Sequence, residues 1–115
     1  MVVGFFKKNQ YDKKVLMSES GYLRPFYDDG ILGVGGHCFA CLVDTPQTGE
    51  RIINLLTSKL YKFYIETNKW SGFHHRIVLQ DLPNILGNID ELTDSNIYKY
   101  FELNEQEIQL IENII

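Results

Sequence analysis

The fold is decided by one stretch, residues 48–70, which reads TGERIINLLTSKLYKFYIETNKW. Its apolar side chains recur at spacings of three and four, which is the pattern of an α-helix with one buried face. The stripe consists of Ile52, Leu56, Leu60 and Phe63, flanked by Ile53 and Tyr64. Thr48 is the expected N-cap, and Glu50 follows in the first turn, where the helix dipole favours an acid. The stretch therefore predicts one long amphipathic helix, which Gly72 is expected to end.

Before this helix, the sequence predicts strands. The residues VLM at 15–17 form a short strand candidate, and a hairpin is expected from about residue 23 to residue 43. The best candidate lies inside that hairpin, where HCFACLV at residues 37–43 is a continuous apolar run between glycines and Asp44. A short apolar run bounded by turn residues is typical of a buried strand.

After the helix, shorter elements are expected. The sequence RIVLQDLPNI at residues 76–85 indicates a brief extended segment closed by Pro83. Two short helices follow, one at about residues 95–101 and one that begins at Asn104, with Glu107 placed as in a capping box. Strands followed by helices predict an α+β domain: a short antiparallel sheet or hairpin, one long amphipathic helix and two short C-terminal helices.

The length of 115 residues and the hydrophobic content of 44% fit one folded domain. Within it we expect a turn-rich opening segment at residues 1–30, a core at 31–85 and an acidic helical tail at 86–115. No run approaches the roughly 20 apolar residues of a membrane helix, so no membrane contact is expected. The expected location is intracellular and soluble, in a host cytoplasm or a virion if the source is a virus. Two cysteines are too few for a disulfide scaffold.

The formal charge of -4 is unevenly distributed. Residues 1–30 and residues 31–85 each hold five Lys or Arg and four acids, whereas residues 86–115 hold one Lys and seven acids. All of the acidic excess therefore lies at the C-terminal end. The remainder is mildly basic, which allows phosphate contacts but falls short of the strongly basic surface of an autonomous DNA-binding protein.

Three motifs that suggest a cofactor, metal or catalytic site are better explained structurally. Cys38 and Cys41 lie three apart in a predicted strand, so their side chains point to opposite faces and cannot share a zinc ion. The glycines at 33–36 lack the Lys-Ser/Thr of a phosphate loop. His74 and His75 are the candidates for a general base, but no nucleophile motif accompanies them. We therefore expect no catalytic, cofactor or metal site.

The segment KWSGFHHR, residues 69–76, is the strongest candidate for ligand contact, because it gathers cations, histidines, a hydroxyl and aromatic rings after a helix. Such side chains contact phosphates and bases. Trp70 and Phe73 are better explained as core anchors. Together with the basic edge of the preceding helix, the predicted DNA-binding residues are Lys59, Lys62, Lys69, Ser71, His74, His75 and Arg76.

Three segments resemble, in order, the C-terminal target-recognition end of restriction-modification DNA adenine methyltransferases of bacteria and large DNA viruses. They are GYLRPFYDDGILGVGGHCF, LLTSKLYKFYIETNKWSGFHHRIVLQDLPNI and IYKYFELNEQEIQLIENI. The resemblance covers the chain from about Ser18 onward and is most distinctive in SKLYKF, KWSGFHH and the following Leu-Pro. The resemblance implies a domain that binds DNA and recognises the target sequence. The family's S-adenosylmethionine site and its Asn-Pro-Pro-Tyr/Phe motif, which holds the flipped adenine, have no counterpart in this sequence.

The sequence therefore favours a non-enzymatic module that recognises duplex DNA, acting alone or with a catalytic methyltransferase or endonuclease chain. A second hypothesis is that the fold serves as a structural or scaffold protein, such as a minor virion or assembly component of a large DNA virus. The acidic tail and the apolar face expected for the last helix fit such protein–protein contacts. A metal-dependent nuclease has little support, because no suitable cluster of acids is present.

Overall fold

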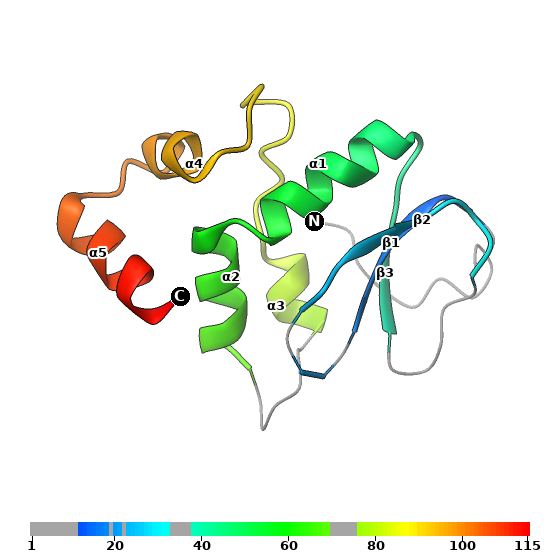
Figure 1. Ribbon diagram of the computed structural model, residues 1–115, viewed down its shortest axis with the longest axis horizontal. Coiled ribbons are helices and arrows are strands. Elements are labelled where there is room, and N and C mark those ends of the chain that lie inside the picture. The colour runs from blue at the N-terminus through cyan, green and yellow to red at the C-terminus, as the bar shows by residue number, and fades with distance from the viewer. Residues whose placement is uncertain (1–11, 19, 22, 33–37, 70–75) are drawn as a thin grey trace.

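A computed structural model describes residues 12–18, 20–21, 23–32, 38–69 and 76–115, without the side chain of residue 76. Within these residues the protein has a three-stranded antiparallel sheet followed by five helices, so the predicted α+β class is confirmed (Figure 1). The elements are β1 (Lys14–Ser18), β2 (Phe26–Asp28), β3 (Cys38–Leu42), α1 (Pro46–Leu56), α2 (Lys59–Thr67), α3 (Arg76–Gln80), α4 (Asp94–Tyr100) and α5 (Glu105–Ile114).

The strands at 15–17 and 37–43 are confirmed in substance as β1 and β3, but the hairpin expected from residue 23 to residue 43 is wrong. The strand order is β2-β1-β3, so β2 and β3 each pair with β1 and not with one another. Val15 lies opposite Tyr27 on one side and Cys41 on the other. The central strand is therefore β1, whose first four residues are all buried.

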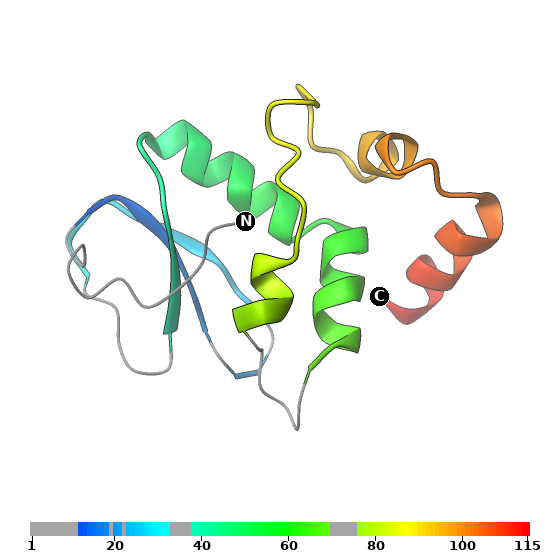
Figure 2. The same cartoon turned by 180° about the vertical axis from the view of Figure 1, so that it is seen from behind.

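The molecule is flattened, with principal extents of 44 × 34 × 17 Å. Figure 1 shows the sheet at one end, α4 and α5 at the other, and α2 and α3 between them. Seen from behind in Figure 2, the C-terminus lies close to α2, and α5 contacts that helix. The acidic C-terminal segment is thus packed against the helix on which the basic edge was predicted.

The predicted long helix is two helices, because the chain breaks at Thr57 and Ser58. Both hydroxyls turn back onto the preceding turn, with Thr57 donating to the carbonyl of Ile53 and Ser58 to that of Leu55. The backbone at Ser58 is extended, and the backbone N–H of Lys59 donates to a carboxylate oxygen of Asp94 at 2.9 Å. Local side-chain hydrogen bonds of this kind compete with helix continuation.

The break changes which residues of the stretch are buried. Tyr61 and Ile65 are each 2% exposed, whereas Leu60 and Phe63 of the predicted stripe are only half-buried. The first helix also begins earlier than predicted. Thr45 is its N-cap, accepting from the backbone N–H of Thr48, and Pro46 takes the first helical position, where its missing N–H costs nothing.

The extended segment expected at residues 76–85 is also wrong in its first half, since residues 76–80 form the short helix α3. This turn buries Leu79 in the core, and Leu82 and Ile85 of the following segment are buried too. The five residues of α3 are too few to show a helical period. The β-branched Ile77 and Val78 therefore made the sequence look like a strand.

The two C-terminal helices are confirmed. Thr93 caps α4 through the backbone N–H of Asn96. At α5 the capping box is complete: Glu107 N–H donates to the Asn104 side chain at 2.8 Å, and Asn104 N–H donates to the Glu107 carboxylate at 3.0 Å. The broad apolar face of α5 is buried only at Ile111, however.

The hydrophobic core joins one face of the sheet to the helices. From the sheet come Val15, Met17, Phe39 and Cys41, and from the helices and the segment after α3 come Ile52, Leu55, Leu56, Tyr61, Ile65, Leu79, Leu82, Ile85 and Ile97. One continuous core thus extends from β1 to α4. Among the described residues, no helix has the length and apolar character that crossing a membrane requires.

Candidate nucleic-acid interface

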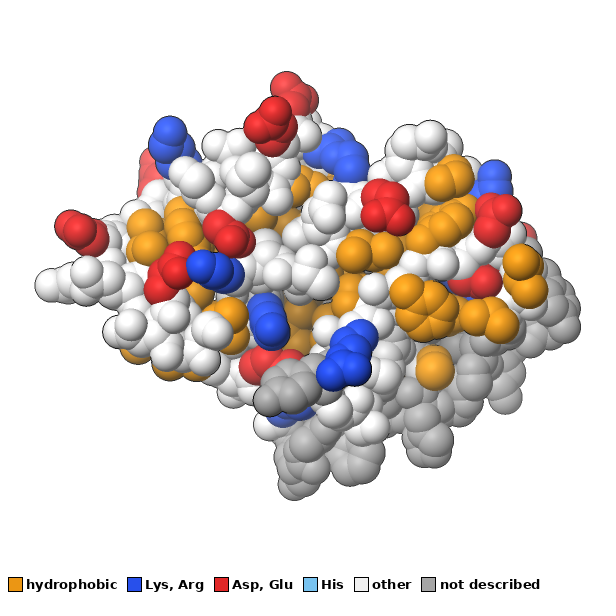
Figure 3. Space-filling view, viewed as in Figure 1, with side chains coloured by type: hydrophobic (Ala, Val, Ile, Leu, Met, Phe, Trp, Pro, Cys, Tyr) orange, Lys and Arg blue, Asp and Glu red, His pale blue; other side chains and the backbone are white. Residues whose placement is uncertain are grey.

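The predicted basic edge lies on and just beyond α2. Lys59 is the first residue of this helix, Lys62 lies one turn later, and Lys69 lies two residues past its end. Figure 3 shows Lys and Arg side chains in the middle of this face of the molecule, with acidic side chains beside them. Whether these cations are available to a polyanion depends on the acids that they contact.

Lys59 forms an ion pair with the acidic tail. Its ammonium lies 2.7 Å from a carboxylate oxygen of Glu112 on α5, and the phenol of Tyr98 donates to the other oxygen at 3.2 Å. The hydrogen bond between Lys59 and Glu112 raises the pKa of Lys59 and lowers the pKa of Glu112, so both groups remain charged near neutral pH. The two side chains are 43% and 40% exposed, so the pair stays open to solvent.

Lys69 is also paired, here within its own segment. Its ammonium lies 3.1 Å from the carboxylate of Glu66, one helical turn earlier, and both side chains are less than one-fifth exposed. Lys69 is therefore less accessible than the sequence suggested, where it was predicted as a leading phosphate contact.

Lys62 is exposed, and the fold brings Arg24 to it. Arg24 precedes β2, and both cations line one hollow of about 470 Å³. Neither forms an ion pair with another described residue. The lining of this Arg24–Lys62 hollow consists of Leu23, Arg24, Lys62, Glu66, Ile114 and Ile115.

Arg24 was not predicted as a contact residue. The sequence feature that could have indicated it is its position: Arg24 is the only arginine of the turn-rich segment 1–30 and comes immediately before Pro25. Arg24 and Lys62 line the same hollow because of the tertiary fold, and no local sequence pattern indicates this arrangement. The four cations Arg24, Lys59, Lys62 and Lys69 face three acids, Glu66, Asp94 and Glu112, so this surface keeps a positive excess of one charge.

The remaining predicted contact residues are not placed. Ser71, His74 and His75 lie outside the described residues, and so does the side chain of Arg76, although its backbone begins α3. The described interface therefore consists of three predicted lysines and one arginine, and it can bind anions by charge.

The two cysteines occupy β3 as predicted. Both are free thiols, with Cys41 buried in the core and Cys38 half-buried. Burial raises the pKa of the Cys41 thiol, which keeps it protonated and unreactive. In the part of the chain that the structure describes, no three His, Cys, Asp or Glu side chains are grouped so as to hold a metal ion.

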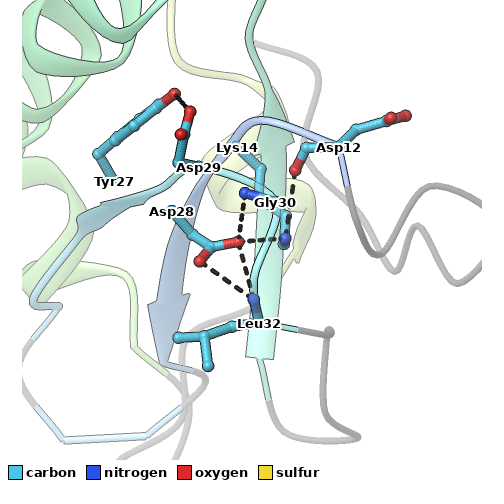
Figure 4. A network of polar contacts seen from close by, with 7 residues as sticks. All are labelled: Asp12, Lys14, Tyr27, Asp28, Asp29, Gly30 and Leu32. Carbon is cyan, nitrogen blue, oxygen red and sulfur yellow. Dashed lines mark hydrogen bonds and ion pairs between the residues drawn. The ribbon is translucent and has the colours of Figure 1, made fainter.

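A buried ion pair joins the two strands β1 and β2 away from this surface (Figure 4). The Lys14 ammonium lies 2.6 Å from Asp28, and the two side chains are 0% and 5% exposed. Asp28 also accepts from the backbone N–H groups of Gly30 and Leu32 at 3.1–3.2 Å. Burial alone would raise the pKa of Asp28, but the hydrogen bonds from Lys14, Leu32 and Gly30 together lower it.

This network organises structure and does not present a reactive group. Asp28 clamps residues 29–32, which turn sharply at Gly30, where φ is 96°. A backbone with positive φ favours glycine. In the segment held by Asp28, Ile31 is 78% exposed and Leu32 is 48% exposed.

Comparisons with protein-family models, curated protein sequences and solved structures give no match to this chain.

Proposed function

We propose that this chain is a non-catalytic DNA-binding module that contacts the phosphates of a duplex with the cations on and around α2. The observation that carries the proposal is the placement of Arg24 beside Lys62, both exposed and without a described acidic partner in an ion pair. These residues come from separate segments, and the fold unites them on one surface. The resemblance to the target-recognition end of adenine methyltransferases supports the same function.

The number of cations sets the expected strength. Each phosphate contact by Lys or Arg contributes a slope of about -0.9 to the dependence of log K on log salt concentration. Two to four contacts therefore give a slope of roughly -2 to -4 and weak binding, with a Kd on the order of 10⁻⁴–10⁻⁶ M near physiological salt. Such affinity suits a module that acts beside a catalytic methyltransferase or endonuclease chain, which we include in the proposal.

The test is binding of a fluorescent duplex by anisotropy at low salt. Arg24→Glu combined with Lys62→Glu reverses both charges of the hollow, and we expect binding to be lost. A matched control, Lys13→Glu with Lys99→Glu, changes the net charge equally at two exposed lysines away from the hollow. Circular dichroism confirms that each variant is folded. Equal loss in both double variants would mean that net charge, not this surface, determines binding, and the proposed site would be wrong.

A second candidate is a protein–protein contact function, favoured by the apolar residues that α5 leaves exposed. Leu110 and Ile114 are 54% and 56% exposed, and Ile115 is 37% exposed. Adjacent apolar side chains on one helix are a common feature of interaction surfaces. Size-exclusion chromatography with light scattering tests this: a stable oligomer that Leu110→Lys with Ile114→Lys converts to monomer, in a chain without DNA affinity, would favour the scaffold function.

A further inference from the structure

A second hollow lies on the other side of α2, and the DNA proposal does not use it. It is lined by Leu60, Tyr61, Tyr64, Asp81, Leu82, Pro83 and Phe101, and we call it the Tyr64 pocket. Lys62 and Tyr64 are two residues apart on the helix, so they project about 200° apart around its axis. A ligand in the Tyr64 pocket would therefore leave the cations of α2 free to bind DNA.

The floor of the Tyr64 pocket is formed by buried, largely apolar side chains. Tyr61 and Leu82 are 2% and 3% exposed, and the Tyr61 phenol donates to the carbonyl of Pro83 at 2.6 Å. This bond ties α2 to the segment after α3. Burial raises the pKa of Tyr61 to about 12, so the phenol keeps its proton for that bond. The ring of Phe101 lies 6.3 Å from that of Tyr61 and forms another wall.

The rim of the pocket is aromatic and acidic. Tyr64 is 38% exposed, and Asp81 is exposed at the start of the Leu-Pro segment. Among the described residues, the Asp81 carboxylate has no ion-pair or hydrogen-bond partner. In the part of the chain that the structure describes, no lysine or arginine lines this pocket. The pocket thus offers ring faces and one uncompensated negative charge.

The volume, charge and aromatic walls of the pocket indicate which kind of chemical group can bind in it. Its volume of about 220 Å³ is below the roughly 300–1,000 Å³ typical of cofactor sites, which indicates a side chain. An anionic group would be repelled by Asp81, and a purely apolar one would desolvate that carboxylate without compensating it. A side chain with an apolar stem and a cationic end suits both the apolar walls and the carboxylate of Asp81. A guanidinium also stacks on aromatic faces.

We propose that the Tyr64 pocket receives an arginine side chain of a partner protein. Its methylene stem lies against Leu60 and Leu82, and its guanidinium meets the ring of Tyr64 and the carboxylate of Asp81. The contact does not depend on DNA binding, so a protein partner and a duplex can occupy opposite sides of α2 together.

The test is an NMR titration of the intact chain with N-acetyl-arginine amide. We expect millimolar binding that shifts the ring resonances of Tyr64 and Phe101 and weakens as salt rises. The matched probe is N-acetyl-citrulline amide, which has nearly the same shape but no charge, and it should bind about fivefold more weakly. Cytidine tests the alternative of a nucleobase in the pocket.

Two exposed positions test the same contact from the protein side. Asp81→Asn keeps the shape of the rim and removes its charge, and it should weaken arginine binding about three- to fivefold. Asp90→Asn, at another exposed acid, is the control and should leave binding unchanged. Equal binding of the arginine and citrulline probes, tighter binding of cytidine, or an absence of shifts at Tyr64 would each overturn the proposal without relying on any variant.

Discussion

The buried ion pair between Lys14 and Asp28 makes a strong prediction about stability. In Asp28→Asn the amide oxygen can still accept from the backbone N–H of Leu32, but the charge that balances Lys14 is lost. The Lys14 side chain is 0% exposed, so its ammonium cannot recover water without local unfolding. Removing one partner of a buried pair costs about 3–5 kcal/mol. Domains of this length have a free energy of unfolding of roughly 6–17 kcal/mol, so the loss is large.

The assay is urea unfolding followed by circular dichroism, with m-values checked for two-state behaviour. Lys14→Met combined with Asp28→Asn removes both charges and should be more stable than Asp28→Asn alone by about 2 kcal/mol. Asp29→Asn is the control at a neighbouring exposed acid and should change stability by less than about 1 kcal/mol. If Asp28→Asn costs no more than this control, the reasoning about the buried pair is refuted.

The same pair predicts a dependence of stability on pH. The pKa of Asp28 is lower in the folded protein than its ordinary value of about 3.9. A group with a lowered folded pKa stabilises the protein above its unfolded pKa, and this contribution is lost as the pH falls through the folded pKa. The stability difference between the native chain and Asp28→Asn should therefore be constant from pH 7 to about pH 5 and shrink below about pH 4. A difference that stays constant to pH 2 would contradict this assignment.

Two further predictions concern packing and capping, and both are read by urea unfolding. A Cβ at Gly49 would lie 2.6 Å from a ring carbon of Tyr27. Gly49→Ala should therefore lower the free energy of unfolding by about 1 kcal/mol, even after the gain in helix propensity. Gly87→Ala is the control and should be neutral, because a Cβ there would meet open space. A stabilised Gly49→Ala protein would show that the ring moves freely. Asn104→Ala removes the cap of α5 and should cost about 1 kcal/mol; an unchanged midpoint would mean that the capping box is dispensable.

Elements with a local signal could be predicted from the sequence. The apolar run around Cys41 is a strand, and the Asn104–Glu107 spacing is a capping box, because each depends on residues that are neighbours in the chain. The break between α1 and α2 could not be predicted in the same way. The Thr57 and Ser58 hydroxyls that turn back onto α1 are local, but the free backbone N–H of Lys59 after the break is bonded by Asp94, which lies 35 residues away.

The candidate site shows the same division. Helical spacing identified Lys59 and Lys62 as surface cations, and both lie on the exposed side of α2. The sequence could not show that Glu112, 53 residues later, pairs with Lys59, or that Arg24 joins Lys62. The ion pair forms where α5 packs on α2, and Arg24 shares a hollow with Lys62, so both arrangements are properties of the tertiary fold.

The most direct test of the central claim is the salt dependence of duplex binding. Titrations between 20 and 200 mM salt should give a linear plot of log K against log salt concentration, with a slope of roughly -2 to -4 for the native chain. Arg24→Gln with Lys62→Gln should reduce the magnitude of that slope by about 2, one phosphate contact for each residue. A slope near zero for the native chain, or one that the double variant leaves unchanged, would contradict DNA binding through this surface.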